Sequence, residues 1–419
     1  MNRVLSKFIS RLVKSGSLII RDADGAEHRF GDGSPPHLHV AIKSRQTERS
    51  IALYPQLAVP EAYMDGELEI IEGDLLDLLQ IAYENMTAHG DNGWRMQLAE
   101  RMNFAFRRLY QLNTRARSRS NVRRHYDLSG ELYRLFLDKD LQYSCAYFER
   151  PDMTLEEAQL AKKRHIAAKL SLEPGQKVLD IGSGWGGMGL YIARQFEANV
   201  LGVTLSEEQH AVSRQRVKAE KLEDRARFEL VDYRALTGPF DRIVSVGMFE
   251  HVGLNHYRTF FNQVARLLAD DGVMLLHTIG RMHGPSVTNP FIRKYIFPGG
   301  YIPALSEVLP AIEKAGLIVT DVEILRLHYA ETLRHWRERF NANRERIEEI
   351  YDKRFARMWD FYLAGSEASF RWQDMVNFQI QITRRRDALP LTRNYMMETE
   401  AALAEREQAL VSSFPRAVE

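Results

Sequence analysis

The stretch KVLDIGSGWGGMGLYIARQF, residues 177–196, constrains the fold of this chain more than any other. Residues 177–181 form a short apolar run that fits a buried parallel strand, and residues 188–196 carry apolar side chains at helical spacing. Gly182 and Gly184 lie between them, and without a Cβ atom they allow a tight turn and a close approach of a ligand to the backbone. The turn also lies at the partly positive start of the helix. The stretch therefore predicts a strand, a glycine turn and a helix that bind a nucleotide-like ligand.

The same glycines belong to the pattern G-x-G-x-x-G of dinucleotide-binding folds, which alone is a weak signal. Such folds place an acid about 20 residues further on, at the end of the second strand, where it binds the ribose. Here the second strand, residues 199–203, is followed by Thr204. The two glutamates that come next fit the first turn of a helix that begins with an S-x-x-Q capping box of Ser206 and Gln209. An adenosyl cofactor with one charged centre therefore fits the pattern better than a dinucleotide.

Strands and helices alternate after residue 125, which is typical of a doubly wound α/β sheet. The predicted strands are 177–181, 199–203, 226–231, 241–246, 272–278 and 317–325, and the predicted helices are 188–196, 206–221, 256–269 and 304–315. Residues 281–303 are an insertion rich in Gly, Pro and aromatic residues. The segment from Glu331 onward is predicted to be a charged helical tail that is interrupted at Pro390. Ligands of such sheets bind outside the carboxyl ends of the strands, so we expect the site there.

Polar residues follow the strands at this edge, namely Thr204, Asp232–Tyr233 and Glu250–His251, and His277 lies within the fifth strand near its end. An Asp–Tyr pair suits adenine, since the carboxylate accepts from the exocyclic amine and the ring offers a stacking face. Asp232 alone fits the N-cap of a helix equally well. Glu250 and His277 belong to adjacent central strands and are predicted to form a hydrogen-bonded pair. Each taken singly is more often a structural polar residue than a catalyst, but their joint placement favours an active site.

The chain begins with a segment whose apolar residues recur at helical spacing, while Arg3, Lys7, Arg11 and Lys14 fall largely opposite them. This basic amphipathic helix has two interpretations: it lies on an anionic membrane, or it docks on its own domain with a solvated basic face. Strand-like segments joined by an Asp24–Gly25 turn follow, and a leucine-rich helix comes after residue 68. Residues 1–100 are therefore predicted to form a small mixed α+β domain.

An arginine-rich segment, residues 101–124, is predicted to link this domain to the next. Its charge suits phosphate, so RNA and phospholipid headgroups are both candidate partners. Since charge runs are usually only solvated, a plain linker is an equally good interpretation.

The composition excludes several other classes of protein. A chain of 419 residues that is 45% hydrophobic is globular and long enough for more than one domain. Its net charge of +1 gives no overall attraction to nucleic acid. The single cysteine, Cys145, forbids an internal disulfide and fits a reducing cytoplasm. No apolar stretch approaches the roughly 20 residues of a membrane span, so neither a signal peptide nor a membrane anchor is predicted.

Residues 121–390 resemble the cyclopropane-fatty-acid synthases and mycolic acid cyclopropane synthases, which are S-adenosylmethionine-dependent methyltransferases acting on lipid double bonds. The resemblance is carried by the ordered motifs NVRRHYDLSGELYRLFLD, YSCAYFE, VLDIGSGWGG, GVTLSEEQ, DYR, DRIVSVGMFEHVG, GVMLLHTIG, IFPGGYIP and LHYAETLRHW. It implies a seven-stranded, Rossmann-like methyltransferase sheet over residues 125–390, with residues 391–419 as a helical tail. The N-terminal domain resembles the extra lipid-associated domain of the bacterial synthases.

The resemblance also assigns site residues by motif. The implied contacts of S-adenosylmethionine are Tyr143, Ser144, Gly182, Ser183, Gly184, Thr204, Leu205, Gln209, Asp232 and Tyr233. A bound bicarbonate is implied at Cys145, Glu250, His277, Tyr329 and the backbone of Ile279, and no metal site is implied. One departure is Ser366, where many relatives carry a second cysteine, so no mechanism of this chain uses a thiol there.

The expected chemistry makes physical demands on such a site. An alkene is a weak nucleophile, so the sulfonium methyl must be held in line with its π face, with water excluded because attack produces a carbocation. Aromatic faces stabilise a cation, and the candidates are Tyr143, Tyr147, Phe148, Tyr295 and Tyr301. Ring closure then needs a base, and bicarbonate oriented by Glu250, His277 and Tyr329 is a plausible one. In this arrangement Cys145 is a wall of the site and not a nucleophile.

The resemblance implies a cyclopropane-fatty-acyl-phospholipid synthase that is a homodimer and acts on unsaturated phospholipid. The single cysteine predicts a cytoplasmic protein, and the basic N-terminal helix, the arginine-rich segment and the lack of a membrane span predict that it associates peripherally with the inner face of the membrane. A fatty-acyl C-methyltransferase acting on the same double bond is the alternative. An RNA or DNA base methyltransferase is disfavoured, since residues 248–251 are Met-Phe-Glu-His where amine methylases carry Asn/Asp-Pro-Pro-aromatic, and no nucleic-acid partner is predicted. A non-catalytic lipid-binding protein would not need the glycine turn together with Glu250, His277 and Tyr329.

Overall fold

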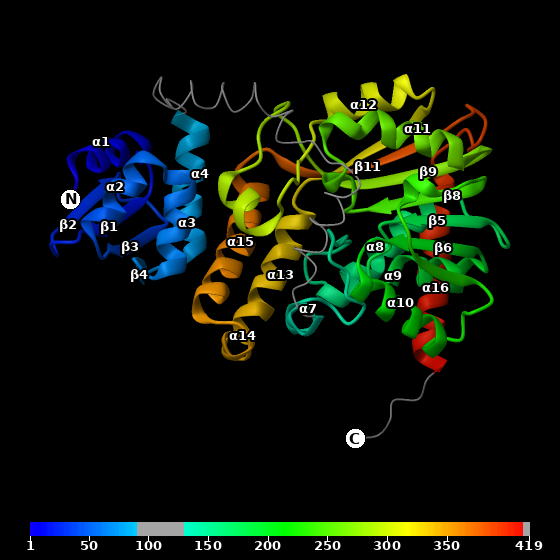
Figure 1. Ribbon diagram of the computed structural model, residues 1–419, viewed down its shortest axis with the longest axis horizontal. Coiled ribbons are helices and arrows are strands. Elements are labelled where there is room, and N and C mark those ends of the chain that lie inside the picture. The colour runs from blue at the N-terminus through cyan, green and yellow to red at the C-terminus, as the bar shows by residue number, and fades with distance from the viewer. Residues whose placement is uncertain (90–129, 414–419) are drawn as a thin grey trace.

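The computed structural model of the chain describes residues 1–89 and 130–413. Figure 1 shows a small N-terminal sheet domain beside a larger one, with the helices α13 (His328–Ala342), α14 (Arg344–Ile350) and α15 (Lys353–Trp372) between them. The segment 101–124 lies outside the described residues. The predicted linker and the domain boundaries predicted at residues 100 and 124 therefore stay predictions. The boundary predicted at residue 390 is likewise not tested and stays a prediction.

The N-terminal domain is built on a four-stranded sheet in the order β2-β1-β3-β4. Its elements are α1 (Arg3–Leu12), β1 (Ser17–Arg21), β2 (Glu27–Gly31), β3 (His37–Ile42), α2 (Arg45–Leu53), α3 (Pro55–Asp65), β4 (Leu68–Glu72) and α4 (Leu75–His89). β1 and β2 form an antiparallel hairpin whose turn holds Gly25 at φ +87°, as the Asp24–Gly25 pair predicts. β1 also pairs in parallel with β3, so the sheet is mixed. The predicted small α+β domain is confirmed.

Helix α1 docks on its own domain. Leu5 and Ile9 are buried in the same core as Leu18 of β1, whereas Lys7 and Arg11 are exposed. Docking of this helix on its own domain is therefore confirmed, its basic face is exposed, and contact of that face with a membrane stays a prediction. Within residues 1–89 and 130–413, no helix combines the length and the apolar character needed to cross a bilayer.

The larger domain holds a seven-stranded sheet in the order β10-β11-β9-β8-β5-β6-β7. Its strands are β5 (Lys177–Ile181), β6 (Asn199–Thr204), β7 (Ala226–Leu230), β8 (Phe240–Val246), β9 (Leu268–Arg281), β10 (Ile318–Leu325) and β11 (Met375–Thr383). The strands from β9 through β7 in this order are parallel, and β11 is antiparallel to both β9 and β10. All of the predicted strands are present, which confirms the doubly wound α/β sheet.

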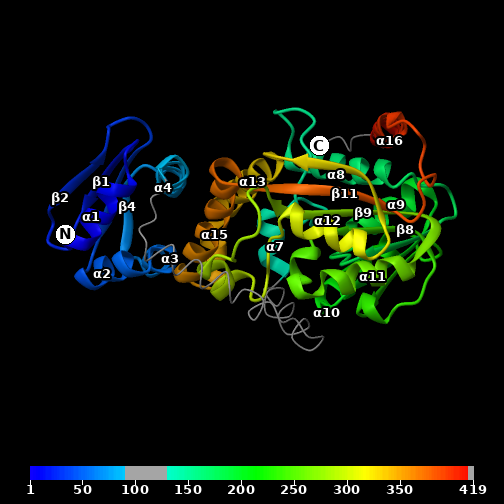
Figure 2. The same cartoon turned by 90° about the horizontal axis from the view of Figure 1, so that it is seen from above.

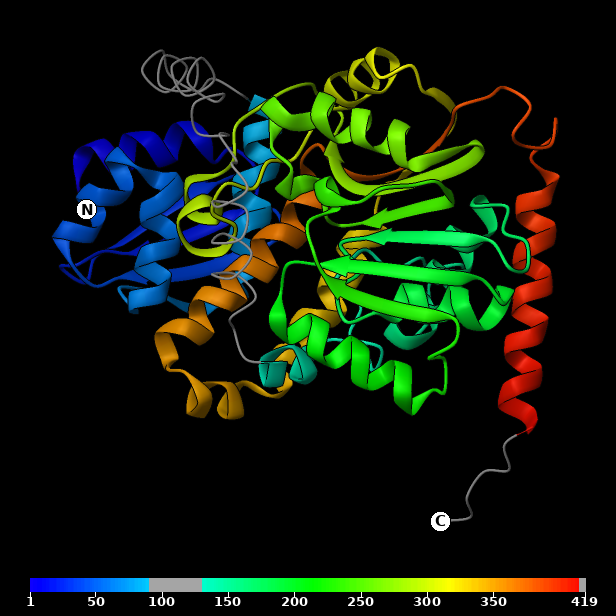
Figure 3. The same cartoon turned by 45° about the vertical axis from the view of Figure 1, so that its right-hand side comes forward.

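Helices cover both faces of this sheet, because neighbouring residues of a strand point to opposite sides. Val178 packs with α8 (Leu155–Lys169), α9 (Gly187–Phe196), α10 (Glu207–Ala219) and α16 (Asn394–Ser413) in one buried cluster. Leu179 packs with α11 (Tyr257–Leu267) and α12 (Leu305–Lys314) in a second cluster. Figure 3 shows α16 along the outer side of the sheet.

The prediction of a helical tail from Glu331 onward is wrong at β11. This strand lies between β9 and β10, and its residues alternate with the period of a strand. Val376, Phe378 and Ile380 enter the core, while Gln379 and its neighbours on the other face are polar and nevertheless buried. Because the polar residues of this strand look solvent-exposed in the sequence and charged segments flank them on both sides, the segment resembles a solvated helix. The two-residue alternation of the strand was therefore overlooked.

Charged side chains join the N-terminal domain to α13 and α15, which Figure 2 shows against it. Arg337 of α13 donates to Asp74 at 2.7 Å and to Asp360 of α15 at 2.8 Å. The Tyr63 hydroxyl of α3 also donates to Asp360, at 2.8 Å. Asp360 is buried, so one carboxylate satisfies donors from both domains.

We expect Asp360→Ala to lower the free energy of unfolding by about 3 kcal/mol, because it removes a buried carboxylate, leaves the Tyr63 hydroxyl without its acceptor and leaves Arg337 with Asp74 alone. Denaturant unfolding measures the change. Asp65→Ala is a matched control, since it removes an ion pair with Arg354 in which both side chains are about half exposed, and it should cost less than about 1 kcal/mol. Equal losses in the two variants would contradict this account of the interface.

Candidate active site

The glycine turn after β5 has the geometry that its sequence predicts. Gly182 has φ +81°, and a Cβ atom there would lie 2.6 Å from Cγ of Met248. Gly184 has φ +54°, and a Cβ atom there would meet nothing within 4 Å. Gly182 is therefore required by packing, whereas Gly184 faces open space beside the start of α9.

That open space is a cavity of about 170 Å³ at the carboxyl ends of β5, β6 and β7. Every residue predicted to contact the cofactor lines it, namely Tyr143, Ser144, Gly182, Ser183, Gly184, Thr204, Leu205, Gln209, Asp232 and Tyr233. The structure thus brings these residues together as the strand-end rule predicts.

The structure tests two local predictions for this cavity. Ser206 caps α10 by accepting from the Gln209 backbone N–H at 3.3 Å, but the Gln209 side chain accepts from the Thr204 hydroxyl at 2.9 Å instead of closing the predicted capping box. Asp232 does cap the following 3₁₀ turn, and its carboxylate also accepts from the Arg234 guanidinium at 2.8 and 2.6 Å. The N-cap interpretation of Asp232 is confirmed, although the same carboxylate lines the cavity.

A second cavity, of about 1330 Å³, contains the residues predicted to be catalytic. Cys145, Glu250, His277, Ile279 and Tyr329 all line it. It continues into the N-terminal domain, where apolar core side chains form its wall, among them Ile9, Leu18, Val40 and Leu68. The two cavities share Tyr143, Ser144, Gly247 and His251, so they meet at these residues.

Glu250 and His277 lie in one cavity but do not form the predicted hydrogen-bonded pair. Glu250 Oε1 accepts from the Ile279 backbone N–H at 2.6 Å, so that N–H is directed at Glu250. Glu250 Oε2 is buried and has no hydrogen-bond partner among the described residues. Burial raises the pKa of this carboxyl group. Glu250 therefore offers an acceptor oxygen to whatever occupies the cavity.

His277 contacts two amide side chains of β11 that the sequence analysis missed, because it assigned that segment to a helix. Its Nε2 lies 2.6 Å from Nδ2 of Asn377, and its Nδ1 lies 3.1 Å from Nε2 of Gln379. Burial lowers the pKa of His277 well below its ordinary value, so the ring is neutral. The partly buried His251 is also kept neutral, since desolvation lowers its pKa to about 4.

The environment of Cys145 fits a wall of the site. The side chain is buried, its Sγ donates to the Ala146 carbonyl at 3.3 Å, and burial raises the pKa of the thiol. A thiol that stays protonated is a poor nucleophile.

The aromatic candidates divide into two groups. Tyr143 and Tyr301 line the large cavity. Tyr147 instead stacks on His165 at a ring distance of 4.0 Å, Phe148 stacks on His335, and Tyr295 donates to Glu61 of the N-terminal domain. The prediction that Tyr147, Phe148 and Tyr295 line the active-site cavity is therefore wrong. Their places are taken by Phe297, Tyr329, Phe361, Tyr362 and Phe370, which come mainly from α15 and the 281–303 insertion.

Comparison with known proteins identifies the family. Residues 113–380 match the family described as mycolic acid cyclopropane synthetase, and residues 4–92 match one described only as a domain of unknown function. A cyclopropane-fatty-acyl-phospholipid synthase of Escherichia coli K12 is 37% identical over 355 residues, 84% of this chain and 89% of the relative. A probable fatty acid methyltransferase of Pseudomonas putida is 37% identical over 350 residues, 82% of this chain and 86% of the relative.

Solved structures agree with this assignment. The cyclopropane synthase MmaA2 of Mycobacterium tuberculosis matches with a TM-score of 0.61 and 37% identity, over 63% of this chain and 97% of that one. The mycolic acid cyclopropane synthase CmaA1, in complex with SAH and CTAB, matches with a TM-score of 0.60 and 38% identity, over 63% of this chain and 97% of that one. The predicted resemblance is confirmed, and the chain belongs to the mycolic acid cyclopropane synthetase family.

Proposed function

We propose that this chain is a cyclopropane-fatty-acyl-phospholipid synthase, which transfers a methylene group from S-adenosylmethionine to the cis double bond of an unsaturated phospholipid acyl chain. The observation that supports this most is the meeting of two cavities. A small cavity behind the glycine turn suits an adenosyl cofactor, and a long apolar cavity suits an acyl chain. They meet at Tyr143, Ser144, Gly247 and His251, where a methyl group would pass from one to the other.

The residues at this junction meet the demands of the reaction. The bound cofactor supplies an electrophilic methyl group. Gly247, at φ +64°, presents no side chain between the cavities, so the double bond can approach in line. The rings of Tyr143, Tyr329 and Tyr362 line the wall and stabilise positive charge, while the apolar surroundings exclude water. Because His251 is neutral, it adds no repulsive charge.

Removal of the proton on ring closure needs a base, and we propose bicarbonate held by Glu250, His277 and Tyr329, beside Cys145 and Ile279. The site fits such a group, because the buried Glu250 Oε2 requires a donor such as a hydroxyl. When bound, bicarbonate would supply the basic oxygen. Glu250 would orient it by accepting its O–H, and the His277 ring and the Tyr329 hydroxyl would donate to it. The Ile279 N–H acts here by holding Glu250.

A fatty-acyl C-methyltransferase is the second candidate, favoured by the name of the Pseudomonas putida relative. The same cavities serve both reactions, which differ only in how the carbocation is quenched. We also propose a homodimer, which analytical ultracentrifugation tests directly.

The proposed function is tested with S-adenosylmethionine labelled in its methyl group and vesicles of unsaturated phospholipid. We expect label in the fatty acids of these vesicles and none in vesicles of saturated phospholipid or in RNA. Label in RNA, or label in saturated and unsaturated lipid alike, would contradict the proposal.

We further propose that the enzyme reaches its substrate by docking peripherally on the anionic inner face of the membrane, through the exposed basic face of α1. Truncation of residues 1–15 would be a poor test, since Leu5 and Ile9 belong to the domain core. The exposed Lys7 and Arg11, one helical turn apart, can be changed without touching that core.

The double variant Lys7→Glu, Arg11→Glu is expected to weaken binding to anionic vesicles by about 30-fold, since each basic residue near such a surface contributes about 1 kcal/mol. Co-sedimentation at low salt measures this. Arg214→Glu, Lys218→Glu is the matched control, because these exposed residues have the same spacing and charge on α10. Equal losses in both double variants would remove α1 from the docking surface.

A further inference from the structure

Strand β11 lies inside the sheet, so both of its faces are buried. One of these buried faces is nevertheless polar. Asn377, Gln379 and Gln381 point to this side of the strand, and each is at most 2% exposed. A buried amide costs free energy unless its groups are paired, so such a row indicates a specific set of partners. Gln379 pairs in register with His277 of β9, which places the row beside the candidate active site.

Two of these amides approach the two nitrogens of the His277 ring. Nδ2 of Asn377 lies 2.6 Å from Nε2 of the ring, and Nε2 of Gln379 lies 3.1 Å from Nδ1. An imidazole always carries at least one N–H, so it cannot accept hydrogen bonds at both nitrogens. One of the two amides must therefore present its oxygen to the ring.

Lys169 decides which amide that is. Its Nζ lies 2.7 Å from Oε1 of Gln379, and an ammonium group has only donors. The oxygen of Gln379 must face Lys169, so its NH₂ group must donate to Nδ1 of His277. The neutral ring then carries its hydrogen on Nε2, and Asn377 accepts it through Oδ1. In this orientation Oδ1 of Asn377 gains a donor, and Nδ2 takes the buried position that Oδ1 otherwise occupies.

Lys169 is itself held by a chain of charged groups. Its Nζ contacts Oε2 of Glu323 on β10, and the same oxygen lies 2.6 Å from Nε2 of His165. His165 Nδ1 lies 2.5 Å from Glu400 of α16, a helix beyond the residues that match the family. Burial alone would raise the pKa of Glu323, but hydrogen bonds and charge from His165 and Lys169 lower it to about 2, so it stays ionised.

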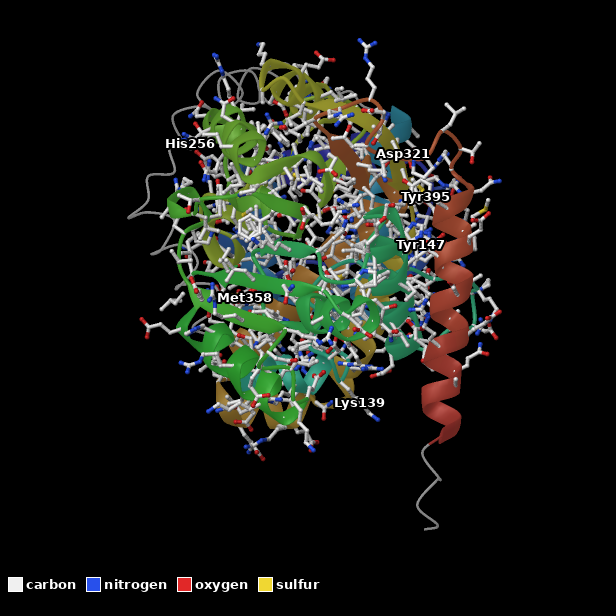
Figure 4. The ribbon with its side chains drawn as sticks, turned by 90° about the vertical axis from the view of Figure 1, so that its right-hand side faces the viewer. Lys139, Tyr147, His256, Asp321, Met358 and Tyr395 are labelled. Atoms are coloured by element: carbon white, nitrogen blue, oxygen red, sulfur yellow. The ribbon has the colours of Figure 1, made fainter. Side chains whose placement is uncertain are left out.

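Figure 4 shows this side of the sheet, with Tyr395 at the start of α16 and Tyr147 and Asp321 beside that helix. Tyr395 of α16 accepts from Gln381 at 2.7 Å, and Gln381 also donates to the Lys169 carbonyl at 2.5 Å. Both the backbone and the side chain of Lys169 are therefore fixed by β10, β11 and α16.

We propose that Lys169 and Gln379 are positioning residues that hold His277 in the Nε2–H tautomer. Asn377 lines the large cavity and Gln379 does not, so Nε2 is the nitrogen on the cavity side. The nitrogen of His277 on the cavity side is therefore an N–H and not a basic nitrogen. The catalytic meaning rests on the proposed function: a bound anion would share this N–H with Oδ1 of Asn377, and His277 does not itself remove the proton.

The tautomer is read directly by ¹⁵N NMR of the full-length protein labelled at its 13 histidines. The His277→Gln variant identifies the resonances of His277 by their loss. We expect a pyridine-type Nδ1 and a pyrrole-type Nε2 at neutral pH. A pyrrole-type Nδ1 in the wild-type protein would overturn the proposal, whatever the substrate of the enzyme proves to be.

The variant Gln379→Glu keeps the shape of the side chain but offers His277 only an acceptor. We expect Nδ1 to become pyrrole-type and kcat to fall by about 10- to 100-fold, the scale seen when a metal-bound histidine loses the partner that orients it. The affinity for S-adenosylmethionine should stay unchanged. Thr383→Asp is the control, since it buries an acid on the same face of β11, where Thr383 donates to the Arg385 carbonyl and contacts neither Lys169 nor His277. It should leave both the His277 resonances and kcat near their wild-type values.

The outcomes separate the possible failures. An unchanged Nδ1 resonance in Gln379→Glu would overturn the role of Gln379. A changed resonance with unchanged kcat would show that the tautomer has no catalytic importance. A protein that makes no cyclopropane lipid but shows the expected tautomer would contradict the proposed function alone.

Discussion

Replacing Glu250 by Gln is expected to lower kcat by about 100- to 10,000-fold, the range that a positioned acid or base contributes. The amide keeps the size of the side chain but replaces an acceptor oxygen by a donor NH₂, so the proposed base loses the group that orients it. Because Glu250 lies outside the cofactor cavity, the affinity for S-adenosylmethionine should not change.

The pH dependence of this effect follows from the burial of Glu250, which raises its pKa above the ordinary value of 4.5. Protonation removes the acceptor, so activity should be lost as the pH falls through that raised pKa, and Glu250→Gln should lack this acidic limb. Glu367→Gln is the control, since Glu367 is a buried glutamate of α15 paired with Arg371 and is not a lining residue of the cavity. Full activity of Glu250→Gln, or no effect of removing carbonate from the wild type, would contradict the assignment.

Gly184→Val is expected to weaken binding of S-adenosylmethionine by about 100-fold. The added side chain would extend into the open space of the cofactor cavity, and overpacking of a fitted site costs about 1–3 kcal/mol. Isothermal titration calorimetry on the folded variant measures the change.

Gly175→Val separates this effect from backbone strain. Gly175 also has a positive φ, +78°, with nothing within 4 Å of a Cβ atom, but it is exposed before β5, at the end of the strand opposite the cavity. Both valines should destabilise the fold by about 1–2 kcal/mol, the cost of a left-handed conformation. Only Gly184→Val should lose affinity, and a loss of the same size in Gly175→Val would mean that strain, not occupation of the cavity, is responsible.

The strand ends of the sheet were predictable from the sequence because each is a local pattern. An apolar run followed by Gly182, Thr204 or Asp232 marks the carboxyl end of a parallel strand, and such ends meet at one edge. The site residues at this edge therefore lie together as expected. The hydrogen bonds between these residues could not be predicted from the sequence. The direction of the Glu250 carboxylate, for example, depends on the backbone N–H of Ile279 in the neighbouring strand.

The parts that the sequence analysis missed depend on contacts between distant segments. Gln379 resembles a surface residue until Lys169 of α8 and His277 of β9 are placed around it. Tyr147 was an aromatic candidate for the cavity by its place in a motif, but stacking on His165 takes it away from the site. The continuation of the large cavity into the N-terminal domain has no local signature, because the residues that line it there are ordinary core residues.

The most direct test of the central claim is the mass of the product formed from S-adenosylmethionine with a fully deuterated methyl group and vesicles of unsaturated phospholipid. Cyclopropanation removes one hydrogen isotope from the transferred carbon, so the fatty-acid product should carry two deuterium atoms in a ring without a double bond. Retention of all three deuterium atoms in a methyl branch would show a fatty-acyl C-methyltransferase and contradict the assignment as a synthase. Absence of deuterium from the lipid would contradict both.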